Sequence, residues 1–242
     1  MKNKINSTIV AFCAWTFAAL LGSMPLAYAA APSSSAISYN LFRNGILLGV
    51  VTEHFETTDG GYRASSEVKA TGLFALVQRE PIRYLSIGDL SKDGLRPQRF
   101  EGYQAGKLAT ADFDWAAARL TLNHDGLNHA LALPPGAQDR LSIMYQLLFS
   151  VRNKGLPLDF AMTNGRKLER YRYVAQSGVT LDTPFKRLNT MHLVKQREAG
   201  DRDSETEIWL ASDYGYLPVK VVIVESDGVR YEQIVTQLDI KP

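Results

Sequence analysis

The chain has 242 residues, of which 45% are hydrophobic and 21% are charged, with 27 Lys and Arg against 25 Asp and Glu. This near balance of charge argues against nucleic acid as a partner, because phosphate backbones are bound by strongly basic surfaces. The only cysteine is Cys13, so the chain has no internal disulfide.

Residues 1–29 have the pattern of a secretory signal peptide. Lys2 and Lys4 precede the uncharged run Ile9–Leu21, and the small-x-small sequence Ala27-Tyr28-Ala29 follows. The apolar run is shorter than the ~20 residues that a transmembrane helix needs. We therefore expect cleavage after Ala29, which leaves a soluble exported chain without cysteine and with no net charge.

The remaining chain is expected to start with a flexible lead-in, residues 30–36, and to continue as one β-rich domain, residues 37–242. Runs with the period-two pattern of strands alternate with turn signals through most of this domain. The first half contains eight such runs: Ile37–Arg43, Ile46–Thr57, Tyr62–Ala70, Ile82–Ile87, Arg96–Tyr103, Lys107–Trp115, Leu120–His124 and Leu127–Leu133.

The first pair of runs is joined by Asn44-Gly45, the dipeptide that most strongly predicts a two-residue hairpin. The hairpin places Arg43 opposite Ile46 and Leu41 opposite Leu48. One face of the pair is then apolar and is expected to lie on a core.

Two segments depart from the strand pattern. Asp139 can cap a helix that runs to about Arg152, and its apolar residues recur at i, i+3, i+4 and i+7: Leu141, Met144, Tyr145 and Leu148. Further apolar residues widen this face, so we expect the helix to be buried on more than one side. Gly72–Val77 is expected to form one short helical turn.

The strand pattern resumes after this helix. Six further runs are predicted: Leu158–Thr163, Leu168–Ala175, Leu188–Arg197, Glu205–Ala211, Val219–Ser226 and Val229–Leu238. Asp227-Gly228 is expected to close the last hairpin, with Glu225 opposite Arg230 and Val224 opposite Tyr231.

Many successive strands with one interior helix predict a mainly β fold. We expect a large antiparallel sheet that curls into an open half-barrel around the helix, since long sheets twist and curl. A closed β-barrel is the alternative.

The sequence contains no recognisable catalytic motif. His124 and His129 are the best candidate metal pair, but solvent-facing strand residues explain them better, so no metal and no cofactor are expected. Ser142 lies outside any G-x-S-x-G motif, which makes a hydrolase the least favoured function. Arg170 and Arg172 alternate with tyrosines, a basic and aromatic pattern that occurs in surfaces that bind nucleic acid. The same pattern fits the solvated face of a sheet, which is the interpretation we favour.

Several blocks together resemble a bacterial exported family that is catalogued as domain of unknown function 3108. The blocks are Gly94-Leu95-Arg96-Pro97-Gln98-Arg99-Phe100, Phe113-Asp114-Trp115, Ala137-Gln138-Asp139-Arg140-Leu141-Ser142, Ile208-Trp209-Leu210-Ala211-Ser212-Asp213 and Tyr216-Leu217-Pro218-Val219. The resemblance spans about Tyr39 to Leu238 and implies a periplasmic protein. The family has no established activity or catalytic residues to carry over.

At the level of shape the chain is also similar to the periplasmic lipoprotein carriers of the Lol type. This resemblance implies an open half-barrel with helices over an apolar cavity. The first hypothesis is therefore a non-enzymatic protein that binds a lipid or a lipoprotein acyl chain in the hollow of its sheet. The residues expected to line or gate this site are Leu73, Phe74, Leu76, Val77, Leu141, Met144, Tyr145 and Leu148. The same residues also fit an ordinary filled core.

The second hypothesis is a structural or interaction protein of the cell envelope, which holds a protein partner through a sheet edge or a surface patch. Contact with a membrane is expected to be peripheral at most. No nucleic acid partner is expected.

Overall fold

The computed structural model describes residues 32–78, 80–153, 158–197 and 204–241. These residues form a single 15-stranded sheet with two short α-helices and one 3-10 turn. The expected signal peptide lies outside the described residues. The first strand begins at Ser34, so residues 34–36 of the expected lead-in belong to the sheet.

The strands follow each other along the chain with short connections. Their bounds are β1 Ser34–Arg43, β2 Ile46–Thr58, β3 Gly61–Ala70, β4 Ile82–Ser91, β5 Gly94–Gln104, β6 Lys107–Asp114, β7 Arg119–His124, β8 Leu127–Ala132, β9 Gln138–Asp139, β10 Leu158–Thr163, β11 Leu168–Asp182, β12 Arg187–Lys195, β13 Glu205–Ala211, β14 Leu217–Val224 and β15 Arg230–Lys241. The helices are α1 Phe74–Val77 and α2 Ser142–Asn153, and η1 is Ser212–Tyr214.

The sheet consists of two wings that meet at β1. From β1 the order runs through β2 to β8 on one side, and through β15 down to β9 on the other. Because most strands pair with their neighbours in the chain, the wings consist largely of successive antiparallel hairpins. The expected sheet was entirely antiparallel, but the short strand β9 pairs with β10 in parallel. The order ends at β8 and β9, so the sheet is an open half-barrel, as the sequence predicts, and the closed-barrel alternative is wrong.

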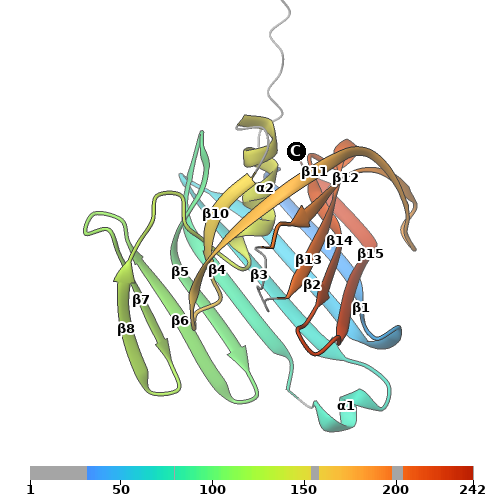
Figure 1. The fold of residues 1–242 in the computed structure, drawn as a ribbon, viewed down its shortest axis with the longest axis horizontal. Coiled ribbons are helices and arrows are strands. Elements are labelled where there is room, and N and C mark those ends of the chain that lie inside the picture. The colour runs from blue at the N-terminus through green and yellow to red at the C-terminus, as the bar shows by residue number, and fades with distance from the viewer. Residues whose placement is uncertain (1–31, 79, 154–157, 198–203, 242) are drawn as a thin grey trace, which may run out of the picture.

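The helix α2 lies in the hollow between the two wings (Figure 1). Leu141, just before its first turn, and Tyr145 are buried in the main core, to which strands of both wings contribute, while Leu147 is buried in a second core with β10, β12 and β13. Met144 packs against both cores. The prediction of a helix buried on more than one side is therefore confirmed.

The first hairpin differs from its predicted register. Arg43 pairs with Ile46 as predicted, but a β-bulge between Leu41 and Phe42 shifts the rest by one residue, so that Leu41 lies opposite Gly49 and not opposite Leu48. A Cβ on Gly49 would come within 2.1 Å of the Lys69 carbonyl oxygen. The bulge thus uses a residue without a side chain at the point of close backbone approach.

The last hairpin is also shifted by one residue. Val224 pairs with Arg230, whereas Glu225 lies in the turn, where its carbonyl accepts a hydrogen bond from the Gly228 N–H. The predicted Glu225–Arg230 pair is therefore wrong, and Arg230 forms its ion pair with Glu232 at 2.6 Å. The turn spans more residues than a two-residue loop.

The strand β11 is longer than predicted. Ser177-Gly178, which looks like a turn in the sequence, forms a bulge within the strand and does not end it. Gln176 pairs with His192 and Val179 with Thr190, which leaves Ser177 and Gly178 unpaired between them. Gly178 has φ +73°, a conformation that glycine adopts without strain. The chain therefore continues in the same strand to Asp182.

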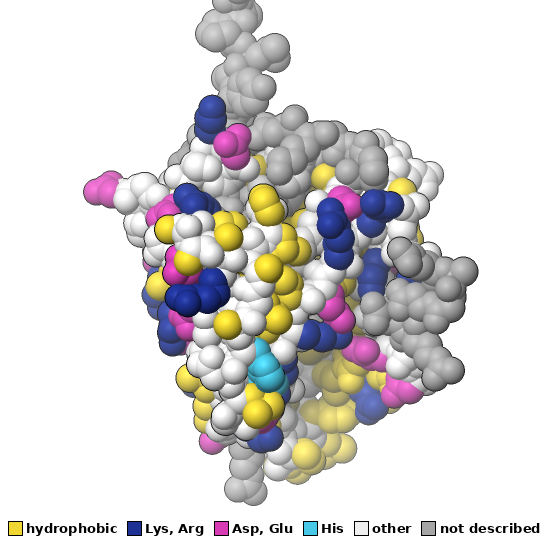
Figure 2. All heavy atoms as spheres, turned by 60° about the vertical axis from the view of Figure 1, so that its left-hand side comes forward, with side chains coloured by type: hydrophobic (Ala, Val, Ile, Leu, Met, Phe, Trp, Pro, Cys, Tyr) yellow, Lys and Arg dark blue, Asp and Glu magenta, His cyan; other side chains and the backbone are white. Residues whose placement is uncertain are grey.

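The edge strand β8 is the most open part of the sheet. All six of its residues are exposed and none is charged. Figure 2 brings this side of the molecule forward and shows a band of hydrophobic side chains with charged ones beside it. Natural sheets protect such edges with charges, prolines or a covering element, so β8 is unusual.

Among the described residues, no helix is long and apolar enough to span a membrane.

Candidate functional site

The structure separates the two groups of residues that the sequence assigns to a ligand site. Leu73, Phe74, Leu76 and Val77 lie in or beside α1, where Leu76 is 70% and Val77 89% exposed. The second group, Leu141, Met144, Tyr145 and Leu148, lies in the hollow, where three are buried and Met144 is half-buried. The helix α1 lies at the lower edge of the sheet in Figure 1, far along the strands from α2.

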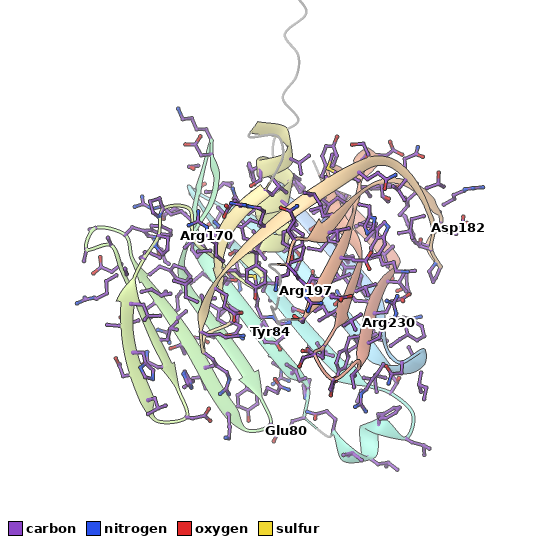
Figure 3. The ribbon with its side chains drawn as sticks, viewed as in Figure 1. Glu80, Tyr84, Arg170, Asp182, Arg197 and Arg230 are labelled. Carbon is purple, nitrogen blue, oxygen red and sulfur yellow. The ribbon has the colours of Figure 1, made fainter. Side chains whose placement is uncertain are left out.

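Leu141 and Met144 border a cavity of about 100 Å³ between α2 and the sheet, which we call the inner cavity. Its wall also carries polar side chains from five strands and from the segment just before α2. These are Tyr39, Glu53, Ser66, Tyr84, Arg140 and Gln233. Figure 3 shows Tyr84 on β4 inside the half-barrel. The cavity is large enough for a few water molecules but is smaller than the pockets of about 300–1,000 Å³ that hold organic ligands.

Glu53 is the buried carboxyl group of this cavity. It lies between Val51 and Phe55 on the inward face of β2 and is 8% exposed. Burial raises the pKa of the Glu53 carboxyl to about 7, and the side chains of Gln233 and Ser66 oppose this shift only in part. Burial penalises the ionised form of a carboxyl group because the surroundings solvate charge less well than water does.

Tyr145 packs over the same region from α2. Its ring stacks on that of Phe55 with 4.5 Å between centroids. Its hydroxyl oxygen faces Glu53 but has no hydrogen-bond partner of standard geometry within the described residues. The inner cavity is therefore a polar region in an otherwise apolar core.

Asp139 anchors the start of α2 to the sheet. One carboxylate oxygen accepts hydrogen bonds from the backbone N–H groups of Leu141 (2.9 Å) and Ser142 (2.8 Å), and the other accepts one from the Ser86 hydroxyl at 2.6 Å. Because Ser86 donates to Asp139, the Tyr62 hydroxyl donates to Ser86, at 2.8 Å. The predicted helix cap is confirmed, and it also joins α2 to β3 and β4.

Ser142 completes this cap. Its hydroxyl accepts a hydrogen bond from the Asp139 N–H at 2.9 Å, the reciprocal half of a capping box. Burial raises the pKa of the Asp139 carboxyl, and the hydrogen bonds from Ser86, Ser142 and Leu141 act in the opposite direction. The serine that the sequence offers for a hydrolase thus has a structural role in the helix cap.

A second, larger cavity lies on the other side of α2, at the end of the sheet that carries the β4–β5 turn. This α2 cleft has a volume of about 620 Å³. Its apolar wall consists of Leu95, Trp115, Ile143, Leu158 and Phe160. Polar side chains surround that wall, namely Ser91, Asp93, Arg96, Gln138, Gln146, Ser150 and Asp159. Its size is in the range of ligand pockets, and its lining suits a molecule with one apolar and one polar end.

Gln138 places an unsatisfied polar atom in this cleft. Its side chain is 1% exposed, and its Nε2 donates to the Leu95 carbonyl oxygen at 2.9 Å. Its Oε1 has no hydrogen-bond partner within the described residues. Buried polar atoms are nearly always paired, so this oxygen stands out as an unsatisfied acceptor in the wall of the cleft.

The β4–β5 turn holds the cleft wall in place through Gln146 of α2. Gln146 Oε1 accepts a hydrogen bond from the Leu95 N–H at 2.6 Å, and its Nε2 donates to the Asp93 carbonyl oxygen at 3.1 Å. Gly94 lies between them with φ +112°, and a Cβ there would come within 2.2 Å of Gln146 Oε1. The positive φ favours glycine at this position, and a side chain here would also displace the Gln146 amide.

The other candidate residues make local contacts on the surface. The His124 and His129 rings stack with 5.8 Å between centroids, and within the described ranges no three His, Cys, Asp or Glu side chains gather as metal ligands would. Arg170 and Arg172 both form ion pairs with Asp159, at 2.8 and 2.9 Å. Asp159 thus supplies a local counter-charge to these two arginines.

Sequence reasoning named Leu141 and Met144, which border the inner cavity, but missed the polar residues that shape both cavities. Glu53 had a signal, because Val51, Glu53 and Phe55 alternate on one strand face and place a carboxyl group among core residues. Gln138 and Gln146 had none, because their importance comes from contacts with Leu95, which lies 43 and 51 residues away in the chain.

A solved structure shares this fold at low sequence identity. The chain is similar to a β-barrel-like protein of domain of unknown function DUF1849 from Brucella abortus, with a TM-score of 0.56 and 10% identity over 87% of this chain and 99% of that one. Two matches have lower TM-scores. A "putative lipoprotein" of Parabacteroides distasonis has 0.35, and a "putative exported protein" with a YmcC-like fold from Bacteroides fragilis has 0.33, each at 8% identity over 86% of this chain and 96% of the other.

No curated protein matches the sequence. A family model does match, and it covers residues 35–234, nearly the whole of the sheet and the helix within it. That range contains both cavities and the anchor of α2. The resemblance seen in the sequence blocks is therefore confirmed, and the chain belongs to the protein family of unknown function DUF3108.

Proposed function

We propose that this chain is a periplasmic protein of the cell envelope that binds a hydrophobic ligand, the acyl chain of a lipid or of a lipoprotein, in the α2 cleft. The observation that carries the proposal is a cleft of about 620 Å³ in which the buried Gln138 Oε1 lacks a partner. The apolar wall around Trp115 takes the acyl chain. The polar end lies among the polar side chains of the cleft, and rotation of the Gln138 amide toward the cleft lets its Oε1 accept a hydrogen bond from this end.

Charge at the mouth of the cleft suits a polar or anionic head group. Arg96 is exposed, and its guanidinium lies 5.1 Å from the centroid of the Trp115 ring. Asp159 lies on the same cleft but is already paired with two arginines. An acyl chain along Trp115 therefore brings a carboxylate or phosphate close to Arg96.

Palmitate titration of the purified protein tests the proposal. In a Trp209→Phe background the fluorescence of Trp115 reports on the cleft, since the remaining tryptophan, Trp15, lies in the expected signal peptide. We expect saturable quenching or a blue shift. Ser150→Phe, which fills the cleft from α2, should weaken binding by about tenfold or more, because the apolar contact area is lost.

Ser226→Phe, in the exposed β14–β15 turn, is the matched control and should bind as the parent does. Pro135→Trp places the same kind of block at the exposed mouth and avoids any effect on the helix. Binding that is equal in the parent and in both blocked variants would contradict the proposal. So would the absence of both a fluorescence response and a bound ligand in native mass spectrometry.

The edge strand β8 supports a second candidate, an interaction protein that accepts a strand from an envelope partner. Its uncharged, exposed edge suits strand addition, in which backbone hydrogen bonds provide affinity. Leu127 and Leu131, which are 52% and 40% exposed, would supply the apolar contacts.

Site-specific photo-crosslinking in cells from Asn128 tests this second candidate. We expect one dominant crosslinked partner, which disappears when Leu127 and Leu131 are replaced by lysine, since charged edges resist pairing. Val174→Lys on β11, a residue 40% exposed like Leu131, is the control. A smear of unrelated products that the lysine variants leave unchanged would count against it.

A further inference from the structure

Exposed apolar side chains gather at one end of the half-barrel. Of the eleven large hydrophobic residues that are exposed in the described chain, eight lie in or just after a chain reversal at this end. We call this set the apolar rim: Ile46, Leu47, Leu73, Phe74, Leu76, Val77, Leu108 and Leu127. The other three are Leu131, Val174 and Val194.

The topology of the sheet brings these residues to the same end. Strands β1 to β8 run alternately up and down, so the connections β1–β2, β3–β4, β5–β6 and β7–β8 all lie at one rim. Each of these connections carries members of the set. Figure 1 shows α1 at this lower edge, and Figure 2 shows hydrophobic side chains at the lower end of the molecule.

The segment around α1 is the most exposed part of the rim. Leu73 is 81%, Leu76 70% and Val77 89% exposed, and none of the four residues of α1 is buried. Residues 71–78 contain no charged side chain. Soluble proteins rarely expose apolar patches of this kind unless the patch contacts a partner or a membrane.

Basic side chains lie just behind the apolar residues. Arg43 is exposed at the end of β1. At the end of β3, Lys69 and Arg83 share the single carboxylate of Glu67, which leaves a net positive charge there. Lys107 and Arg166 converge on the single carboxylate of Asp125, which leaves that cluster with a net positive charge. Apolar tips with cations set back from them match a bilayer surface, where cations meet head groups and apolar side chains reach the acyl boundary.

We propose that the apolar rim docks on the surface of a phospholipid bilayer that contains anionic lipids, with α1 inserted among the head groups. The rim residues stand at the ends of four separate chain reversals, so a protein partner would need a pit for each, whereas a fluid bilayer adapts to all of them. The α2 cleft opens at the opposite end, beside the β4–β5 turn. The docking therefore does not depend on the proposed ligand.

Vesicle sedimentation tests this proposal with the purified protein. Vesicles of phosphatidylcholine alone are compared with vesicles that contain phosphatidylglycerol, at low and at high salt. We expect the protein to sediment with the anionic vesicles, and less so at high salt because screening weakens the contacts of the basic side chains. Replacement of Leu73, Leu76 and Val77 by glutamine should lower the partition coefficient about tenfold or more.

A matched control removes the same number of exposed apolar side chains elsewhere, with Leu131, Val174 and Val194 replaced by glutamine. This variant should stay within about twofold of the parent. Both triple variants should keep the parent's circular dichroism, because the replaced side chains are at least one-third exposed. Ser150→Phe should sediment as the parent does, which separates this proposal from ligand binding in the cleft.

Three results would overturn the proposal. They are a parent protein that sediments with neither vesicle, a rim variant that sediments as well as the parent, and a control variant that loses as much as the rim variant. The depth to which α1 inserts into the bilayer is measured independently with Leu76→Trp and brominated lipids. Quenching of this tryptophan, beyond that in the unsubstituted protein, is expected, and its absence would contradict insertion of α1.

Discussion

Replacing Asp139 with alanine is expected to lower the free energy of unfolding by about 4 kcal/mol, a large fraction of the 5–15 kcal/mol typical of a domain. The change leaves the Ser86 hydroxyl and two backbone N–H groups without their acceptor in a fully buried place. Each lost buried hydrogen bond costs about 1–3 kcal/mol, in part because the stranded donor is not rehydrated. Urea unfolding followed by circular dichroism measures the loss.

Asp139→Asn is the matched control for this experiment. Its side-chain oxygen can still accept from the N–H groups of Leu141 and Ser142, and Ser86 can accept from its amide. We expect it to lose less than half as much stability as Asp139→Ala. If the alanine variant loses less than about 1 kcal/mol, the buried cap is not what holds α2 in the hollow.

Replacing Glu53 with glutamine is expected to change how stability depends on pH. In the folded chain the pKa of Glu53 is raised from its ordinary 4.5 to about 7. The folded state therefore holds this proton more tightly than the unfolded state does. Its contribution to stability is fully present below about pH 4.5 and is lost as the pH rises through about 7.

The loss is on the order of 3 kcal/mol, since each pKa unit corresponds to about 1.4 kcal/mol. Glu53→Gln keeps the shape of the side chain and removes the ionisation. We expect the variant to be more stable than the parent at pH 8 by roughly this amount and nearly equal to it at pH 5. Unfolding curves at several pH values give the difference directly.

Glu56→Gln is the control, because Glu56 lies on the same strand but is exposed. It should shift stability by less than about 0.5 kcal/mol at either pH. The comparison of variant with parent cancels the contribution of other carboxylates, such as Asp125 and Asp159, whose pKa values are lowered by ion pairs. A Glu53→Gln variant with the parent's pH profile would mean that the carboxyl group is solvated in the folded state.

The local features of the fold were readable from the residues, and their exact pairing was not. The period-two runs predicted most strands, and Asp139 with the apolar face of Leu141 and Tyr145 predicted α2 and its burial. The register of the first hairpin failed because the bulge at Leu41–Phe42 depends on the close approach of Gly49 to β3. That approach involves a strand outside the hairpin.

The candidate site was harder to predict than the fold. An apolar segment looks the same in sequence whether it lines a hollow or projects into solvent, so Leu73 and Leu141 received the same assignment. The structure places the first on an exposed rim and the second in the core. What distinguishes them is coverage by other strands, and no local pattern records it.

By itself the sequence determined the type of most elements, the family and the wrapping of a sheet around one helix, because alternation and capping are properties of neighbouring residues. Only the tertiary structure decided which apolar side chains are covered, where a cavity remains and which buried polar atoms lack partners. These depend on contacts such as Gln146 with Leu95 and Ser86 with Asp139, which join residues 51 and 53 positions apart. Such distances are closed by the curl of the whole sheet.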